Sequence, residues 1–308
     1  MPKNATLTKR QITLIISLVS ALIGTIATSC SDDKPKSPGK SGASQSSNTP
    51  RKNTAPAEAQ GQGDGTPTRP SSVSRVNADG LVTIDHGGFK LLYDCDRRTA
   101  LRYEYELQAD RGSVARPEDF KLDPELPKGC GQQFNAKSYA SVHKGWDRGH
   151  LVTSNHMDYN ADYILRANYM TNIVPQASQF NQGIWIEAEN VAECYRDLAP
   201  VKVYGGVVYG NDRAATDNDY FVESHGIRTP EYFWKAVVTT QPRSTELRAI
   251  AWLIPNRNEL GPLDKYLISI SDLEKRVGRE QVGIELPAAL KDSRPARGWV
   301  LPQNCSVK

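Results

Sequence analysis

Large apolar residues are confined to parts of this 308-residue chain, and their placement limits what can fold. One apolar run spans residues 12–27, but no Val, Leu, Ile, Met, Phe, Tyr or Trp occurs from Ser31 to Pro70. A segment of small and polar residues cannot bury enough apolar surface to offset the entropy lost on ordering. We therefore predict a disordered tether over residues 30–70 and one folded domain over residues 71–308.

The first 29 residues have the pattern of an export signal, because basic residues precede the apolar run (Lys3, Lys9 and Arg10). The run ends in Ala-Thr-Ser-Cys at residues 27–30, which resembles the lipobox of bacterial lipoproteins except that Ala27 replaces the preferred Leu. We expect an exported, cell-envelope lipoprotein that contacts a membrane only through a lipid on Cys30. The alternatives are secretion or release into a periplasm without the lipid, and an uncleaved anchor.

Four cysteines remain in the predicted domain: Cys95, Cys130, Cys194 and Cys305. An even number in an exported chain predicts two disulfides, and three pairings are possible. The spacings contain no C-x-x-C, which argues against a structural zinc site. Four unpaired thiols in the core are the alternative.

The net charge of +3 is misleading, because it comes from outside the predicted domain. Residues 1–29 contribute three positive charges and residues 30–70 contribute two more, so residues 71–308 carry a net charge of −2. Net charge therefore gives no support to nucleic-acid binding, and any attraction for phosphate has to be local.

The domain combines predicted strands with fewer helices. Runs of β-branched and aromatic residues predict strands at residues 89–93, 100–107, 201–209, 232–240 and 247–255. Residues 111–127 are rich in charge and Pro and predict a loop. Residues 163–169 predict a helix, and residues 170–175 predict a short extended piece. A capping box at Ser271 to Glu274 predicts a second helix that ends at Val277. This pattern favours an α+β fold around a mixed, mostly antiparallel sheet flanked by helices.

Residues that can accept a proton, bind a phosphate or bind a cation occur in Asp-Arg-Gly-His at residues 147–150 and in the segment from Asn181 to Glu189. A neutral imidazole such as that of His150 accepts a proton from water near pH 7, so activity should fall below about pH 6.5. A guanidinium such as that of Arg148 holds a phosphate through two parallel hydrogen bonds. An amide oxygen with a nearby carboxylate suits a hard cation that keeps most of its waters.

A helix opening at residues 175–178 should carry Asn181 and Glu189. Its apolar face is Phe180, Ile184, Ala188, Val191, Tyr195 and Leu198. On an ideal helix Glu189 is rotated about 80° from Asn181 and displaced about 12 Å, which suits a carboxylate that orients the water ligands of a cation rather than a second direct ligand.

Structural roles compete with several of these assignments. A lone His at a strand end is usually structural, and His150 gains weight from its neighbours Arg148 and Gly149 and from the later Asn and Glu. His156 follows His150 by six residues, but no third ligand at metal spacing accompanies the pair. The other histidines are expected to be surface or structural residues, and Tyr169 and Trp185 to be core aromatics rather than base-stacking ones.

Together, the segments at residues 147–150, 171–176 and 181–185 and Glu189 resemble the sugar-non-specific DNA/RNA endonucleases, the ββα-metal nucleases of the Serratia nuclease and endonuclease G type. The resemblance implies His150 as general base, Asn181 as the one direct Mg²⁺ ligand and Glu189 as a ligand through water. It also implies that Arg148 is the motif arginine, that Asn172 supports the site near His150, and that Arg116 stabilises the charged transition state. The chain departs from some members at Glu193, where they carry an Arg; a phosphate contact there would need Arg196.

The implied activity is hydrolysis of DNA and RNA phosphodiesters with Mg²⁺, for which Mn²⁺ is the expected substitute, and with little sequence or sugar preference. The alternative is a catalytically silent, nucleic-acid-binding envelope lipoprotein. A toxin for competitors is less favoured, because no separate delivery domain is apparent in the sequence. The sequence leaves open the biological role, the preference between DNA and RNA, and the oligomeric state.

Overall fold

The computed structural model describes residues 62–210, 219–303 and 305. The chain divides into two units, Met1–Pro56 and Ala57–Lys308, and the described residues all belong to the second. The predicted export signal, Cys30 and residues 31–61 of the predicted tether lie outside the described residues. Within the described ranges, no helix has the length and apolar character needed to cross a membrane.

The predicted end of the tether at Pro70 lies too far along the chain, because residues within 62–70 form hydrogen bonds to the folded domain. Tyr159 O accepts a 3.0 Å hydrogen bond from the backbone N–H of Asp64, and Tyr163 Oη accepts a 2.8 Å bond from the N–H of Arg69. Asn160 Nδ2 donates to Thr66 O at 3.0 Å. In each contact the residue before Pro70 uses its backbone, which needs no large apolar side chain, and this is why composition did not reveal the contacts.

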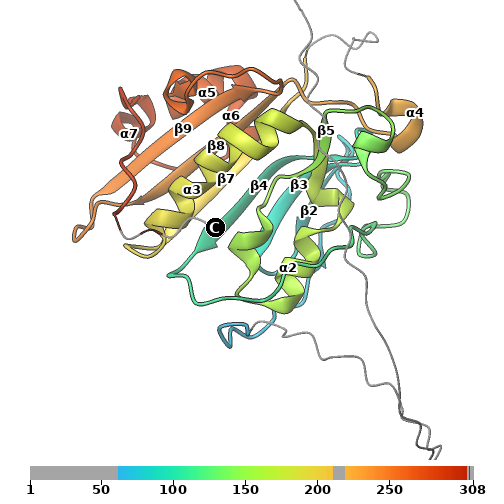
Figure 1. Ribbon diagram of the computed structural model, residues 1–308, viewed down its shortest axis with the longest axis horizontal. Coiled ribbons are helices and arrows are strands. Elements are labelled where there is room, and N and C mark those ends of the chain that lie inside the picture. Colours follow the sequence, from blue (N-terminus) through green and yellow to red (C-terminus); the bar gives the residue numbers. More distant parts are fainter. Residues whose placement is uncertain (1–61, 211–218, 304, 306–308) are drawn as a thin grey trace, which may run out of the picture. The chain divides into compact units, whose positions relative to one another are not determined.

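An antiparallel eight-stranded sheet forms the centre of the unit, in the order β1-β2-β3-β4-β7-β8-β9-β10 (Figure 1). The strands are β1 (Ser72–Val73), β2 (Leu81–Asp85), β3 (Phe89–Asp94), β4 (Thr99–Leu107), β7 (Val201–Val208), β8 (Tyr232–Thr240), β9 (Leu247–Pro255) and β10 (Leu267–Ile268). Each of the five long strands expected from β-branched and aromatic runs is present. The α+β prediction is confirmed, with a sheet that is antiparallel throughout.

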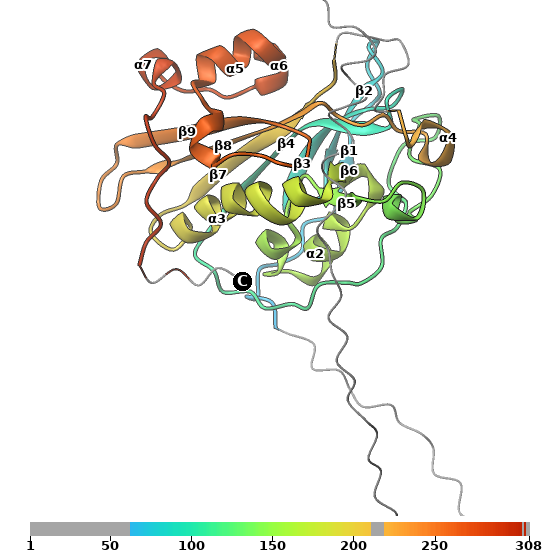
Figure 2. The same ribbon diagram turned by 45° about the horizontal axis from the view of Figure 1, so that its top comes forward.

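Helices and a second, two-stranded sheet cover the two faces of the central sheet. Figure 2 shows α5 (Ile270–Val277), α6 (Arg279–Val282) and α7 (Ala288–Asp292) on one side, and α2 (Ala161–Ala167), α3 (Trp185–Tyr195) and the pair of β5 (Trp146–His150) and β6 (Ile173–Ala177) on the other. Short helical turns lie at Tyr139–Ser141, Ser154–Met157, Met170–Asn172, Phe180–Ile184 and Leu263–Tyr266, and α4 spans Val222–His225.

Strand β8 is buried on both faces and separates two cores. Phe233 packs on Phe180 and Trp185, with ring centroids 5.0 and 5.5 Å apart. The next residue, Trp234, points the other way into a smaller cluster under α5 and α6 that contains Leu273. This alternation fixes which β8 side chains can reach α3, and among them is the fully buried Lys235.

The helix predicted to open at residues 175–178 begins later. Pro175–Ala177 lie in β6, where Pro175 pairs with Arg148 and Ala177 with Trp146. A π-helical turn at Phe180–Ile184 follows, and Gly183, with φ −121° and ψ −105°, interrupts the helical geometry before α3. The ideal-helix offset between Asn181 and Glu189 therefore does not apply, because a turn of different pitch separates them.

The cap of α5 also differs from the prediction. Ser269 is the N-cap, and its side chain accepts a 3.0 Å hydrogen bond from the N–H of Asp272. Ser271 lies within the helix and instead bonds to Asp292 through its side chain. Both serines precede acidic residues, so the sequence pattern alone fits either one as the cap.

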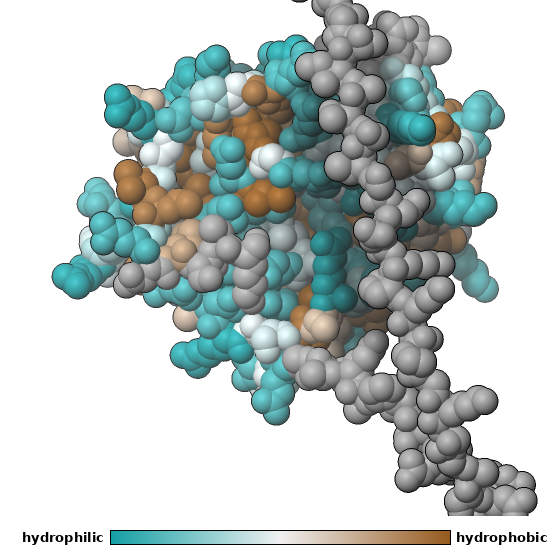
Figure 3. Space-filling model, viewed as in Figure 1, coloured by the Kyte–Doolittle hydropathy of each residue, from teal (hydrophilic) through white to brown (hydrophobic). Residues whose placement is uncertain are grey.

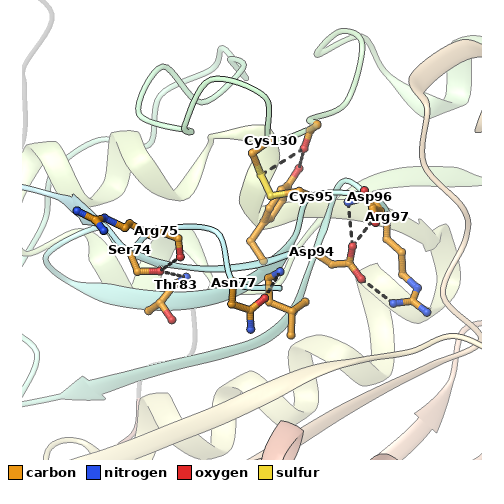
Figure 4. The surroundings of a disulfide bond; sticks show 12 residues. Ser74, Arg75, Asn77, Thr83, Asp94, Cys95, Asp96, Arg97 and Cys130 are labelled. Carbon is orange, nitrogen blue, oxygen red and sulfur yellow. Dashed lines mark hydrogen bonds and ion pairs between the residues drawn. A yellow bond between two sulfur atoms is a disulfide. The ribbon is translucent and has the colours of Figure 1, made fainter. Parts of the chain in front are cut away.

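Two disulfides join Cys95 to Cys130 and Cys194 to Cys305. The first ties the β3–β4 turn to the loop that leads toward β5 (Figure 4). Beside Cys95 the turn is held by Asp94, whose Oδ1 accepts 2.9 Å hydrogen bonds from the N–H groups of Asp96 and Arg97. The expectation of two disulfides is confirmed, and the structure selects one of the three pairings.

On the face shown in Figure 3, hydrophobic residues form separate patches among hydrophilic ones. Large apolar side chains that are exposed in the described residues are scattered over several elements: Val76, Leu122, Phe134, Val142, Ile186, Leu198, Tyr220, Leu247, Val300 and Leu301. Leu198, predicted on the apolar face of the long helix, lies beyond the end of α3 and is exposed, whereas the other predicted members of that face are buried.

Candidate active site

The end of β5, the segment that follows it, the π-helical turn and α3 border a cavity of about 570 Å³. Five of the six residues selected from the sequence line this cavity: Arg116, Arg148, His150, Asn181 and Glu189. They come from a loop, a strand, a π-helical turn and a helix, so the sheet and the helix have to pack before the set assembles. The sixth, Asn172, lies outside the cavity.

His150 is the last residue of β5, and one side of its ring is held by hydrogen bonds. Its Nε2 lies 2.9 Å from Asn168 Oδ1 and 3.0 Å from Ser154 Oγ. Asn168 Nδ2 donates to Pro117 O at 2.7 Å, which leaves Asn168 Oδ1 as an acceptor toward the imidazole. Nε2 of neutral His150 therefore carries the hydrogen, and Nδ1 keeps the lone pair of a base.

The charge state of His150 is set by burial and by positive neighbours. Desolvation, then the charge of Arg116 and that of Arg148, lower the pKa of His150 to about 3, against the opposing effect of the Asn168 hydrogen bond. A depressed pKa keeps the imidazole neutral well below pH 6.5. The ring is therefore available as a proton acceptor over the whole neutral range.

Asn172 supports the segment after His150 rather than His150 itself. It is fully buried, accepts a 2.9 Å hydrogen bond from the N–H of Val152 and donates to Val152 O and Ala167 O at 2.9 and 2.8 Å. Besides Ser154, the direct side-chain partner of His150 is Asn168, which no sequence pattern indicated. Its only local signal is its place as the residue that ends α2.

Two arginines supply positive charge to the cavity. Arg148 is fixed on two sides, since its Nη1 donates to Ala136 O at 2.8 Å and its guanidinium lies 3.9 Å from the ring centroid of Phe120. Three or more of its N–H donors stay available for a phosphate. Arg116 lines the same cavity; burial lowers the pKa of its guanidinium, while the charge of Glu189 raises it.

The orientation of the Asn181 amide is set by a carboxylate of the same motif as His150. Asp147 Oδ2 accepts hydrogen bonds from Asn181 Nδ2 at 3.0 Å and from Gln182 Nε2 at 2.8 Å, and Asp147 Oδ1 accepts one from Ser178 Oγ at 2.7 Å. A carboxylate can only accept, so the amide nitrogen of Asn181 has to face it. The amide oxygen, the atom that a hard cation prefers, is thereby directed away from Asp147.

Glu189 is held from two sides. Thr153 Oγ1 donates to Glu189 Oε1, and Lys235 Nζ lies 3.4 Å from the same oxygen. Lys235 is fully buried and its Nζ lies 4.1 Å from the ring centroid of Trp185. Burial lowers the pKa of Lys235, and the charge of Glu189 raises it. The sequence did carry a signal for Lys235, since it is the one charged residue in the otherwise uncharged run Tyr232–Thr240.

The region one turn beyond Glu189 is not a second phosphate site. Arg196 is buried, its Nε donates to Gln108 O at 2.8 Å, and its Nη1 lies 3.2 Å from Glu193 Oε2. Arg196 therefore does not replace the arginine that some relatives of this sequence pattern carry at position 193. Glu193 itself lines the cavity, beside its ion-pair partner Arg196.

His156 also points into this buried network. Its Nδ1 lies 2.7 Å from Tyr105 Oη and its Nε2 lies 3.4 Å from Glu193 Oε2. Within the part of the chain that the structure describes, no group of three or more His, Cys, Asp or Glu residues is arranged to hold a metal. Both ring nitrogens of His156 face protein partners, Tyr105 and Glu193. Of the other histidines, His86 and His225 are buried and His143 is exposed.

Comparison with known proteins connects this geometry to a family. The family model for DNA/RNA non-specific endonucleases matches residues 71–292. The chain is 27% identical to mouse mitochondrial nuclease EXOG over 168 residues, which are 52% of this chain and 45% of that protein. It is 24% identical to human mitochondrial endonuclease G over 67% of this chain and 71% of that protein, and 23% identical to the Serratia marcescens nuclease over 74% and 84%.

A solved structure shares the fold. The crystal structure described as the EndoG/EndoGI complex superposes with a TM-score of 0.53 at 20% identity, covering 67% of this chain and 86% of that chain. The chain spans about half the length of the EXOG relatives from mouse and Xenopus laevis that it matches, 45% and 54%. The likeness in structure supports the α+β fold.

Proposed function

The chain belongs to the DNA/RNA non-specific endonuclease family, and from this premise we propose that it is a divalent-metal-dependent endonuclease that hydrolyses phosphodiester bonds of DNA and RNA. One observation carries the proposal: a base-competent His150, two arginines and the side chains of Asn181 and Glu189 line one cavity. Phosphate, water and a cation are the groups that such a set would hold.

His150 acts as the general base in this proposal. Its Nε2–H is held by Asn168, so Nδ1 accepts the proton when water attacks the phosphorus. Arg148 and Arg116 neutralise the charge that grows on the phosphate oxygens. None of these side chains reads a base edge, which fits weak selection among sequences and between sugars.

The residues fit a hard divalent cation. The donor set is made of oxygen atoms, with the Asn181 amide oriented by Asp147 and the Glu189 carboxylate anchored by Thr153. Asn181 would be the direct ligand and Glu189 would bind through the water shell, as Mg²⁺ keeps most of its waters; Mn²⁺ has the same oxygen preference. When bound, the cation would supply Lewis-acid stabilisation of the phosphate and of the leaving oxygen.

The test is cleavage of plasmid DNA and of RNA by residues 57–308, with Mg²⁺, with Mn²⁺ and with EDTA. We expect cleavage only with metal, and a His150→Ala variant should lose at least about a hundredfold in kcat, the usual contribution of a general base. Circular dichroism and thermal melting of the variant serve as controls for folding. A variant that cuts as fast as wild type would remove His150 from the mechanism while leaving the nuclease activity standing.

The alternative is a nucleic-acid-binding protein without catalysis. It predicts that the wild-type chain retains labelled DNA in a gel-shift assay but leaves it intact with Mg²⁺, Mn²⁺, Ca²⁺ and Zn²⁺ across neutral pH. That outcome would overturn the enzyme proposal. The simultaneous presence of His150, Asn181 and Glu189 in one cavity favours the enzyme.

We also propose that the chain is exported and anchored to the cell envelope through a lipid on Cys30. The support is the basic and apolar pattern of residues 1–29 and the Ala-Thr-Ser-Cys sequence at residues 27–30. Labelling with radioactive palmitate in a bacterial host should modify the wild type and not a Cys30→Ser variant. Label on both, or on neither while both are exported, would exclude this anchor.

A further inference from the structure

An exposed aromatic group lies at the start of β5, beside the candidate active site but outside its cavity. The ring of Tyr220 lies with its centroid 4.1 Å from that of His143 and 5.9 Å from that of Trp146. Tyr220 is 41% exposed, His143 is exposed and Trp146 is partly exposed. These three residues are called the aromatic platform below.

The platform lies on the same side of β5 as His150. Successive side chains of a strand alternate, which puts Trp146, Arg148 and His150 on one face and Asp147 with Gly149 on the other. The contacts agree: Asp147 bonds to Asn181 on the helix side, whereas Trp146 packs on Phe221. At about 3.4 Å per residue, Trp146 lies about 7 Å from Arg148 and about 14 Å from His150 along the strand.

The rear of the platform is rigid. Phe221 is fully buried, its ring centroid lies 5.9 Å from that of Trp146 at an interplanar angle of 74°, and it also packs on Tyr139 at 4.7 Å. A ring fixed from behind loses little conformational freedom when a flat ligand covers its free face. Packing alone explains Trp146, but it does not require the exposed rings of Tyr220 and His143.

The charged side chains that can attract a phosphate are distributed unevenly between the two ends of the cavity. Glu189 and Glu193 line the end formed by α3, where they pair with the buried cations Lys235 and Arg196 at 3.4 and 3.2 Å, so these two cations are already engaged and contribute little attraction for a phosphate backbone. At the other end Arg148 lies between His150 and the platform, and the exposed Lys144 precedes Trp146 by two residues. Asp147, the acidic residue of this strand, accepts hydrogen bonds from Ser178, Asn181 and Gln182. A strand bound at His150 is therefore directed along β5 toward the platform.

We propose that the aromatic platform is a nucleobase-stacking subsite for the substrate strand, about one or two nucleotides from the phosphate held at Arg148 and His150. The subsite rests on the proposed function for its substrate class and extends it by assigning a contact to bases. Stacking accepts every base, because each has a π face, so it adds affinity without sequence preference. It also favours strands whose bases are unpaired over closed duplexes.

The test measures binding without cleavage, with the full chain in EDTA. The probe is a fluorescently labelled single-stranded DNA octamer, and the matched probe is an octamer of abasic sites with the same phosphates. We expect the wild type to bind the base-bearing octamer more tightly than the abasic one by roughly 5- to 150-fold, the range of one stacked base. The Tyr220→Leu variant should lose at least about fivefold on the base-bearing octamer and stay unchanged on the abasic one.

Two further variants complete the design. Trp146→Leu should weaken binding to the base-bearing octamer and not to the abasic one. If Trp146→Leu impairs folding, Tyr220→Leu alone still tests the subsite, because Tyr220 is exposed. Tyr204→Leu is the matched control, because Tyr204 is a partly exposed tyrosine packed on the α5 and α6 side of the sheet, away from the cavity. Equal weakening on both octamers, or no change in Tyr220→Leu, would overturn the subsite.

Failure of the subsite and failure of the proposed function give different results. Base-dependent binding in EDTA is measured whether or not the chain cleaves DNA, and plasmid cleavage with Mg²⁺ is measured whether or not Tyr220 contributes. Cleavage by a chain whose affinity is the same for both octamers would remove the subsite alone. Base-dependent binding by a chain that never cleaves would remove the endonuclease alone.

Discussion

At the scale of single residues, the protonation of His150 differs from what its residue type suggests. The sequence alone predicts loss of activity below about pH 6.5, the ordinary range of an imidazole. In the structure, burial and then the charges of Arg116 and Arg148 lower the pKa of His150 to about 3. A base works in its neutral form, so a lower pKa extends activity toward acid.

The pH profile tests this effect. For the wild type, the acid limb of kcat/KM, measured with bis(p-nitrophenyl) phosphate, should lie below pH 6.5. Arg116→Gln removes a positive charge near the ring, so the pKa of His150 rises and the limb moves toward pH 6.5. Arg75→Gln, a charge removed from an exposed site outside the cavity, is the control. Coincident limbs for Arg116→Gln and wild type would show that Arg116 does not act on His150.

Asp147 is the residue through which the motif reaches the proposed cation. It holds the Asn181 amide nitrogen at 3.0 Å and thus directs the amide oxygen. Asp147→Ala should raise the Mg²⁺ concentration for half-maximal activity by roughly 10- to 100-fold, as for other residues that orient a metal ligand. Gln182→Ala, which removes a neighbouring donor to Asp147 but no proposed ligand, should change it much less. Similar shifts in both variants would argue against this orientation role.

At the scale of elements, the pairing of β5 with β6 depends on Gly149. A Cβ at Gly149 would lie 2.1 Å from Gln176 Cδ and Oε1, and Gln176 is fully buried on the neighbouring strand. The side chain of Gln176 therefore occupies the space that any larger residue at position 149 would need. The glycine of the motif follows from the close packing of β5, which carries Arg148 and His150, against β6.

Substitution of Gly149 and Gln176 tests whether a side chain at position 149 competes with that of Gln176 for the same space. Gly149→Ala is expected to lower the free energy of unfolding by about 1–3 kcal/mol, the usual cost of overpacking a core. The double variant Gly149→Ala with Gln176→Ala should be more stable than Gly149→Ala alone, because the clashing side chain is gone. Urea unfolding followed by circular dichroism measures both. No recovery in the double variant would place the damage elsewhere than at Gln176.

The later start of the helix after β6 is also decided at this scale. Pro175 is a good first residue for a helix, and local chemistry favoured that reading. In the fold, Pro175 pairs with Arg148 as part of β6, and the following π-helical turn places Asn181 next to Asp147. Strand pairing with a segment some 27 residues earlier overrides the local preference.

At the scale of the whole molecule, the two disulfides close loops of different length. Cys95 and Cys130 are 35 residues apart, and Cys194 and Cys305 are 111 residues apart. In the chain-entropy account, the disulfide that closes the longer loop stabilises the folded state by about 5 kcal/mol and the other disulfide by about 4 kcal/mol. The second bond also joins the end of α3, which carries Glu189, to the last described residue.

Removal of each bond separates these contributions. Cys194→Ser with Cys305→Ser should lower the free energy of unfolding by about 3–5 kcal/mol, and by about 1 kcal/mol more than Cys95→Ser with Cys130→Ser. Urea unfolding without reductant is the measurement, and the wild type with reductant should approach the sum of both losses. A larger loss from the Cys95–Cys130 pair would show that contacts around the β3–β4 turn outweigh loop length.

Much of this protein could be derived from its sequence, because the signals are local. Alternating and β-branched runs identified five long strands, since side-chain periodicity depends only on the strand itself. The Asp-Arg-Gly-His motif and the later Asn181 and Glu189 indicated the site chemistry, since residue types fix what each group can bind or protonate. An even cysteine count indicated two disulfides but not their pairing.

The remainder was decided only by the tertiary structure. Lys235 lies beneath Glu189 because β8 and α3 pack face to face, and Asn168 reaches His150 because α2 ends beside β5. The same packing buries Arg196, depresses the pKa of His150 and selects Cys194 as the partner of Cys305. Each of these depends on contacts between residues distant in the chain, for which no local pattern exists, because distance in space is set by the packing of whole elements.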